Sequence, residues 1–192
     1  MKVIGINGSA RRDGNTAIMI RRIFEELEKE GIETELIQLA GETIRGCTAC
    51  GKCRQNKDGK CIIVKDIVND IIEKMAGADG IVLGSPVYFS NVTPEMKALM
   101  DRAGRVVRAN DFMLEKKVGA AVTAVRRGGA LPTFNAMNNF FLVEKMIIPG
   151  STYWNLGIGR EIGDVESDKE GMENMADLGR NIAWLLKRIS PS

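Results

Sequence analysis

All the cysteines of the chain lie in one short segment, Cys47, Cys50, Cys53 and Cys61, with the spacing Cys-x2-Cys-x2-Cys-x7-Cys. Three cysteines at this spacing can wrap one iron–sulfur cubane, with a fourth ligand arriving from further along the chain. Zinc sites usually combine two cysteine pairs across a long stretch, and the third cysteine here lacks a near partner. The spacing therefore favours an iron–sulfur site, with zinc, a disulfide or four free thiols as the alternatives.

The composition restricts the chemistry further, because the chain contains no histidine. Histidine is the commonest general base and transition-metal nitrogen ligand, so a bound metal must rely on thiolates or carboxylates. In a reducing cytoplasm, a compact group of cysteines indicates metal or redox chemistry more than structural disulfides. Glycines in the segment let backbone N–H groups turn toward sulfur, and cations there offset the thiolate charge. These residues are Gly46, Gly51, Gly59, Lys52, Arg54, Lys57 and Lys60.

A second distinctive segment runs from Gly8 to Thr16, between an apolar run and a helical pattern. It carries hydroxyls on Ser9 and Thr16, the amide of Asn15 and the positive charge of Arg11. The start of a helix offers unpaired N–H groups and a positive dipole end to an anion. The segment matches neither the P-loop nor the Gly-x-Gly-x-x-Gly dinucleotide pattern. It predicts a socket for a terminal phosphate, with a polar turn and helix cap as the alternative.

This segment resembles the Gly-Ser-x-Arg-x-x-Gly-Asn-Thr phosphate loop of the NADPH-dependent FMN reductase family, within the flavodoxin-like superfamily. The resemblance continues through Gly84–Thr93 and Asp101-Arg102 and spans essentially the whole chain. The cysteine segment resembles the compact motif of the iron–sulfur flavoproteins, which lies after the second strand and binds a [4Fe–4S] cluster. The chain is therefore identified as a member of that family. Membership implies FMN as a cofactor, together with a [4Fe–4S] cluster held by the four cysteines.

In the family, the loop at 84–93 runs under the flavin ring. Tyr88 and Phe89 offer flat apolar surface, while backbone N–H groups and Asn91 can reach the ring edge or the ribityl chain. A proline turn with two core aromatics is the alternative. A third flavin loop is implied after the fourth strand, where Arg126 or Arg127 either tunes the flavin or lies on the surface. The expected FMN contacts are Ser9, Arg11, Asn15, Thr16, Pro86, Val87, Tyr88, Phe89, Asn91, Thr123, Arg126, Gly128 and Gly129.

The elements that must position these loops alternate along the chain. Apolar runs predict strands at 2–7, 32–39, 80–84, 117–125 and 146–148, the last continuing toward 154. Helical periodicity predicts helices at 16–30, 65–76, 93–105, 131–145 and 168–189. Such alternation predicts a doubly wound α/β parallel sheet with helices on both faces, and its ligand belongs at the carboxyl edge of the strands. The resemblance implies the flavodoxin-like strand order 2-1-3-4-5, in one domain over 1–192 with a cysteine-rich insertion at about 44–62.

Charge and hydropathy exclude other classes. The 192 residues include 27 Lys and Arg against 25 Asp and Glu, a net charge of +2. This balance gives no reason to expect nucleic acid as a partner. No apolar run approaches the ~20 residues that cross a bilayer, and the N-terminus does not resemble a signal peptide. We therefore expect a cytoplasmic protein without a membrane partner.

These observations support three hypotheses about function. The first is an iron–sulfur flavoprotein that passes electrons from ferredoxin or NAD(P)H to a small-molecule or protein acceptor. The second is an NAD(P)H-dependent FMN or quinone reductase with zinc or no cluster, and the third is a non-catalytic electron carrier. No catalytic side chain is expected, because the cofactors carry the reaction. The resemblance also implies a homodimer or homotetramer.

Overall fold

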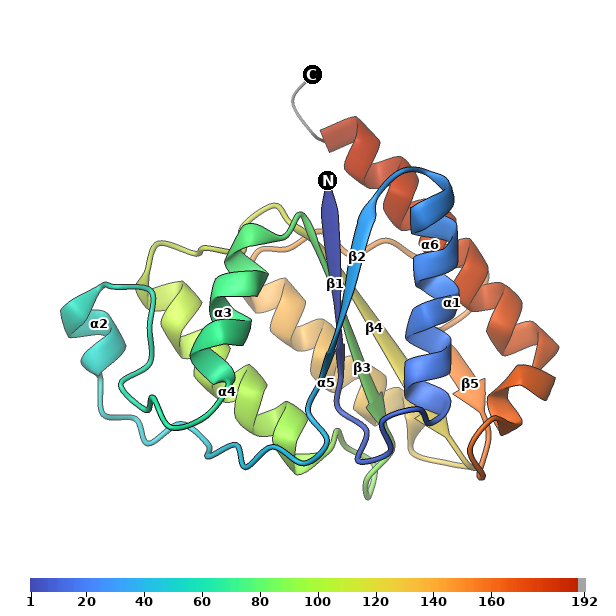
Figure 1. The fold of residues 1–192 in the computed structure, drawn as a ribbon, viewed down its shortest axis with the longest axis horizontal. Coiled ribbons are helices and arrows are strands. Elements are labelled where there is room, and N and C mark those ends of the chain that lie inside the picture. The colour runs from blue at the N-terminus through green and yellow to red at the C-terminus, as the bar shows by residue number, and fades with distance from the viewer. Residues whose placement is uncertain (190–192) are drawn as a thin grey trace.

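A parallel five-stranded sheet organises the chain, and the computed structural model describes residues 1–189 (Figure 1). The strand order is β2-β1-β3-β4-β5, which confirms the predicted order and fold class. Residues 190–192 of the predicted domain lie outside the described residues. The strands are β1 Lys2–Asn7, β2 Glu33–Gln38, β3 Gly80–Pro86, β4 Val118–Val125 and β5 Leu156–Ile158.

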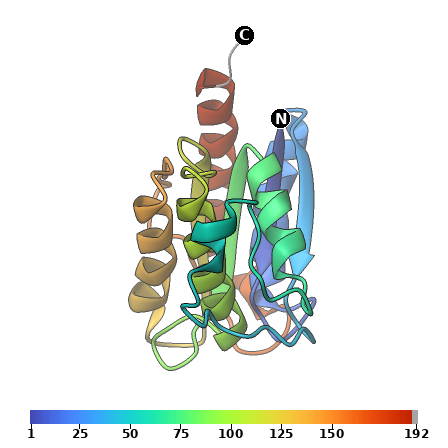
Figure 2. The ribbon, with the colours of Figure 1, turned by 90° about the vertical axis from the view of Figure 1, so that its left-hand side faces the viewer.

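Helices cover both faces of the sheet, as predicted. One face packs against α1 and α6, and the other packs against α3, α4 and α5 (Figure 1). The short helix α2 lies outside this layer, against α4, where Figure 2 shows it in front. The helices are α1 Asn15–Lys29, α2 Lys52–Asn56, α3 Val68–Gly77, α4 Pro94–Ala109, α5 Ala130–Val143 and α6 Lys169–Ile189, with a 3-10 helix, η1, at Asp164–Ser167.

The central strands are mostly apolar because both of their faces are covered. Every residue of β4 is buried, as are all but the ends of β1 and β3, the pattern expected of a covered parallel strand. At the carboxyl end of β3, a Cβ on Gly84 would lie 2.8 Å from Cγ2 of Thr16. Only glycine therefore lets the start of α1 approach β3 this closely.

The fifth strand lies later in the chain than predicted. The run at 146–148 forms a single parallel bridge, between Ile147 and Val118. The chain then leaves the sheet and returns as Leu156–Ile158, alongside the end of β4. Pro149 lacks the N–H that the next ladder bond would need. The apolar run therefore marks the edge of the sheet without forming the strand.

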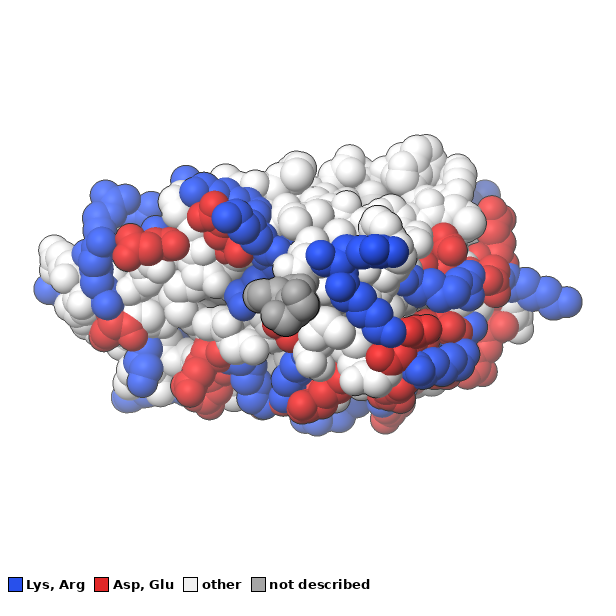
Figure 3. All heavy atoms as spheres, turned by 90° about the horizontal axis from the view of Figure 1, so that it is seen from above, with Lys and Arg blue, Asp and Glu red and all other residues white. Residues whose placement is uncertain are grey.

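Charged side chains of both signs are mixed over the face seen from above in Figure 3. The described part of this face therefore carries no uniformly basic patch of the kind that nucleic-acid-binding domains present. Within residues 1–189, no helix combines the length and apolarity that a bilayer crossing requires.

Candidate functional site

Four loops meet at the carboxyl edge of the sheet and enclose a cavity of about 210 Å³. Eight of the predicted FMN contacts line it: Ser9, Arg11, Asn15, Thr16, Pro86, Val87, Tyr88 and Arg126. Three further lining residues, Ala124, Gly159 and Arg160, were not predicted. The structure thus brings the loops after β1, β3 and β4 to one place, as the topology required, and adds the loop after β5.

The start of α1 leaves hydrogen-bonding groups open toward this cavity. Its N-cap residue, Gly14, has no side-chain cap, and its first turn contains no acidic residue. The Thr16 hydroxyl is buried and has no hydrogen-bond partner. Since buried polar atoms are nearly always paired, a free hydroxyl beside unpaired helix N–H groups fits a phosphate.

Two predicted phosphate contacts, Arg11 and Asn15, also hold the loop after β5. The Asn15 amide donates to the Glu161 carbonyl at 2.9 Å and accepts from the Gly163 N–H at 3.0 Å. Arg11 donates from its guanidinium to the Arg160 carbonyl at 3.0 Å. Both residues line the cavity while bracing its wall. This loop was not predicted, because the predicted fifth strand ends before Leu156, where β5 begins. Gly159, directly after β5, was the available signal in the sequence.

The loop after β3 folds into a tight hairpin whose tip projects from the protein. Tyr88 and Asn91 exchange backbone hydrogen bonds of 2.8 and 3.0 Å. Between them, Phe89 and Ser90 have φ values of 48° and 61°, a left-handed geometry that costs non-glycine residues roughly 1–2 kcal/mol each. Phe89 is fully exposed and Tyr88 is 43% exposed. Strained backbone and bare aromatic surface together indicate a place that a ligand covers.

The loop after β4 packs directly against this hairpin. Gly129 has a φ of 84°, and a Cβ there would lie 2.9 Å from the Ser90 hydroxyl and from Cγ1 of Val87. Gly128 shows no such crowding. Thr123 is fully buried in β4, and its hydroxyl has no partner. Five predicted contacts do not line the cavity: Phe89, Asn91, Thr123, Gly128 and Gly129. Binding of FMN by any of the thirteen residues stays a prediction.

The four cysteines surround one small, largely apolar hollow against α4. Cys47, Cys50, Cys53 and Cys61 all line it, and all four thiols are free. Among the described residues, no three Cys, Asp or Glu side chains stand in an arrangement ready to hold a metal ion. The segment contains the short helix α2, which was not predicted. The cysteines are thus gathered at one site but are not arranged as ligands.

Local backbone geometry favours thiolates at this hollow. Ala49 and Gly51 have positive φ values of 54° and 74°, and the Ala49 N–H donates to Sγ of Cys47 at 3.4 Å. The Lys52 N–H is the main cause of a lowered pKa at Cys50. N–H groups aimed at sulfur stabilise its anionic form, which is the form that binds metals.

Two asparagines fasten the cysteine segment to the helices behind it. Asn69 accepts from the Cys61 N–H at 2.8 Å and donates to the Cys61 carbonyl at 2.9 Å. Asn110 accepts from the Gly59 N–H at 3.0 Å. The later part of the segment therefore has a defined position on α3 and α4.

The cysteine hollow does not lie at the carboxyl edge, where the loop after β2 begins. It contacts α4 at Arg102, Arg105 and Val106, whereas α4 begins at Pro94, beside the edge. With a rise of 1.5 Å per residue, these positions lie roughly 12–18 Å along the helix. The segment is long enough to pack back along α4 instead.

Comparisons with known proteins agree with these features. The family model described as NADPH-dependent FMN reductase matches residues 1–161. An iron–sulfur flavoprotein of Methanocaldococcus jannaschii is 43% identical to this chain, over an alignment that covers 98% of this chain and 99% of the relative. The chain belongs to the NADPH-dependent FMN reductase family, and within it to the iron–sulfur flavoproteins. This confirms the family identified from the sequence.

Further similarities support the same conclusion. An iron–sulfur flavoprotein of Methanosarcina thermophila is 32% identical, covering 98% of this chain and 97% of its own. A solved WrbA-like flavodoxin from Agrobacterium tumefaciens has a TM-score of 0.68 at 14% identity and covers 98% of both chains, which shows the flavodoxin-like fold. The flavoprotein described here is an FMN-dependent oxidoreductase. The open groups at the start of α1 fit the FMN phosphate.

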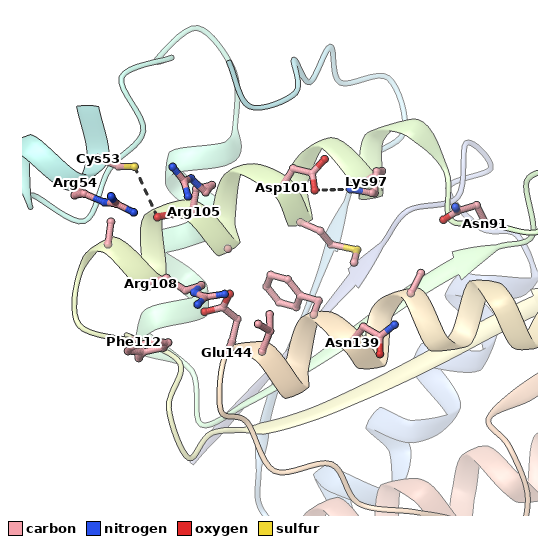
Figure 4. A pocket seen from close by; sticks show the side chains of 16 residues that line it. Cys53, Arg54, Asn91, Lys97, Asp101, Arg105, Arg108, Phe112, Asn139 and Glu144 are labelled. Carbon is pink, nitrogen blue, oxygen red and sulfur yellow. Dashed lines mark hydrogen bonds and ion pairs between the residues drawn. The ribbon is translucent and has the colours of Figure 1, made fainter. Parts of the chain in front are cut away.

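A further cavity lies elsewhere, in a groove of about 710 Å³ between α4 and α5 (Figure 4). Cys53 lines one end and Asn91 the other (Figure 4). Glu144 on its wall is 1% exposed, and Oε2 of its carboxyl has no partner. Burial raises the pKa of Glu144 to about 7, against a smaller lowering by Arg108. Its carboxyl therefore titrates near neutral pH.

This carboxyl makes stability depend on pH. Because the folded pKa of Glu144 is about 7 and its ordinary value is 4.5, the folded state binds the proton more tightly. Stability is therefore fully present below about pH 4.5 and is lost as pH rises toward 7, by up to about 3 kcal/mol. We expect Glu144→Gln to lie within about 1 kcal/mol of the wild type at pH 5 and to exceed it by about 1–3 kcal/mol at pH 8.

Urea unfolding at saturating FMN, repeated from pH 5 to 8, measures this difference. The exposed Glu73→Gln is the matched control, and its stability should follow the wild type throughout. Parallel pH profiles for Glu144→Gln and the wild type would show that the Glu144 carboxyl is ordinary.

Proposed function

We propose that this chain holds FMN at the carboxyl edge and a [4Fe–4S] cluster at its four cysteines, and passes electrons from ferredoxin or NAD(P)H to an acceptor. The observation that carries the proposal is that all four thiols line one hollow on a chain that also has an open phosphate socket. The similarity to two proteins that are named iron–sulfur flavoproteins supports the proposal of a cluster. A cytoplasmic location and a homodimer or homotetramer are part of the same proposal.

The residues at the carboxyl edge have separate tasks in this proposal. The first turn of α1, with Thr16 and Ser9, binds the phosphate. The hairpin at 88–91 lies against the flavin ring and excludes water from one side of it, through Tyr88 and Phe89. Arg126, which lines the cavity, supplies a positive charge that favours the anionic reduced ring.

The cysteine site supplies the second half of the function. FMN exchanges one or two electrons and an iron–sulfur cluster exchanges one, so the pair connects two-electron with one-electron partners. The thiolates of Cys47, Cys50, Cys53 and Cys61 bind the iron. The N–H groups aimed at Cys47 and Cys50 stabilise the charge on sulfur. The chain must draw the four sulfurs together around the metal, since they are not arranged as ligands without it.

A second candidate is an NAD(P)H-dependent FMN or quinone reductase without a cluster. The match to the NADPH-dependent FMN reductase model and the lack of a ready metal site among the described residues favour it.

An anaerobic donor assay decides among these candidates. The purified protein is mixed with NADH, NADPH or reduced ferredoxin, and flavin bleaching is followed before and after a quinone is added. Under the proposed function, ferredoxin or NAD(P)H bleaches the flavin, metal-free protein loses activity, and the acceptor turns over repeatedly. Equal quinone turnover by metal-free protein with NAD(P)H would establish the second candidate instead. Bleaching of the flavin without turnover of any acceptor would contradict both candidates.

A further inference from the structure

Arg102 is the largest of the fully buried side chains in the described structure. Its guanidinium pairs with the Asp66 carboxylate, and both side chains are shielded from solvent. The same group donates to the Arg45 carbonyl at 3.3 Å and to the Ile63 carbonyl at 2.8 Å. These two carbonyls belong to the chain on either side of the cysteine segment. Arg102 therefore ties both ends of that segment to α4.

One donor of this guanidinium has no partner. The Nε atom of Arg102 is buried and makes no hydrogen bond, although Arg102 lines the cysteine hollow. Burial lowers the pKa of Arg102, but the Asp66 carboxylate and then the Cys61 sulfur raise it, so the pKa ends above its ordinary value. Arg102 and Cys61 line the same hollow, and an arginine side chain keeps its positive charge in proteins. A buried, charged donor without an acceptor is rare in native structures.

We propose that Arg102 is a positioning residue of the cysteine site, where it presents a fixed positive charge and its free Nε–H to the sulfur atoms of the cluster. The proposal rests on the proposed function, because it needs a cluster at the cysteines. The structural observation behind it is independent of the spacing of the cysteines. If the position only needed to be filled, an apolar side chain would do so without burying a charge. If Arg102 only tied Asp66 and the two carbonyls together, its Nε–H would have no role.

The charge of Arg102 has a definite electrochemical consequence. Four thiolates give the metal site a net negative charge, which grows by one when one electron arrives from the donor. A buried guanidinium stabilises the more negative form and so raises the reduction potential. Arg102 keeps its proton in both states, so no proton accompanies the electron at this residue.

Opposite shifts from two substitutions test the proposal. Arg102→Gln removes the charge but keeps an amide donor, and the midpoint potential of the cluster should fall. We expect at least about a tenfold change in the one-electron equilibrium, which equals about 59 mV. Asp66→Asn removes the nearby negative charge, and the potential should rise. In the wild type, the Val68 N–H donates a hydrogen bond to the Asp66 carboxylate at 3.2 Å. The side-chain oxygen of asparagine can still accept this bond.

Anaerobic redox titration of the purified flavoproteins measures these potentials, with iron and FMN content determined on the same samples. Arg105→Gln is the matched control, because Arg105 lines the same hollow but is exposed. Solvent screening should keep its shift well below that of Arg102→Gln. If Arg102→Gln fails to fold or loses its iron, Asp66→Asn carries the test, and its potential must still rise.

The possible results separate the two claims. If the substitutions only loosened and hydrated the site, the midpoint potentials of Arg102→Gln and Asp66→Asn would shift in the same direction. That result would overturn the role of Arg102. Unchanged potentials in iron-loaded variants would overturn it as well. Wild-type protein that contains FMN but no iron would instead contradict the cluster itself, and the present proposal with it.

Discussion

Cys50→Ser is expected to lose its iron and keep its FMN. Cys50 lies in the middle of the cysteine segment, and the Lys52 N–H lowers the pKa of its thiol, so it is well suited to be a thiolate ligand. Removing a supporting partner of a metal site typically costs 10- to 100-fold in affinity, and removing a ligand should cost at least that. We expect iron content to fall at least about tenfold. FMN should remain, because none of the cysteines lines the FMN cavity.

The measurement is anaerobic purification of both proteins, followed by iron and FMN assays on the same fractions. Gln55→Ser provides the control, since it places a serine on the exposed surface of α2 without removing a thiol. Its iron and FMN contents should equal those of the wild type. Full iron in Cys50→Ser, or loss of FMN together with iron, would contradict separate sites for the two groups.

The second large effect is expected at Thr16, whose buried hydroxyl has no partner in the cavity wall. Thr16→Val removes one hydrogen bond to a charged phosphate, worth about 1.5–3 kcal/mol, and should weaken FMN binding about 10- to 150-fold. Thr16→Asp places a negative charge beside the phosphate. Repulsion of about 4 kcal/mol at close range should then weaken binding about 1000-fold.

Titration of the apoproteins with FMN, followed by flavin fluorescence, gives these affinities. Thermal melts of the apoproteins measure their stability, which Thr16→Val should leave unchanged or raise although it weakens FMN binding. Thr16→Val deletes a buried, unpaired hydroxyl, so its apoprotein should be at least as stable as the wild type. Thr34→Val on β2 serves as the control and should bind FMN normally. Unchanged FMN affinity in Thr16→Val would show that the phosphate does not occupy the start of α1.

The sequence predicted the layers of the fold well because burial on both faces leaves a plain signal. β1, β3 and β4 read as apolar runs, and α1 and α4 begin near their predicted positions. The predicted fifth strand was wrong because Met146–Ile148 is apolar for a different reason, packing at the end of the sheet beside Val118. An apolar run records burial and does not record hydrogen-bond pairing.

The candidate site was less predictable because part of it depends on contacts between distant residues. The resemblance singled out the loops after β1 and β3, and the structure places residues of both loops in the wall of one cavity. Nothing local indicates that Asn15 braces Gly163, or that Arg102 of α4 pairs with Asp66. A buried arginine on an amphipathic helix looks like a surface charge until its neighbours are known. The position of the cysteines along α4 also required the structure.

The most direct test of the central claim is the metal and cofactor content of the wild-type protein. The protein is purified without oxygen, and FMN, iron, zinc and acid-labile sulfide are measured in one sample, together with its absorbance spectrum. We predict one FMN with about four iron and about four sulfide per chain, and broad absorbance beyond the flavin bands. FMN accompanied by zinc, or by no metal at all, would contradict the account.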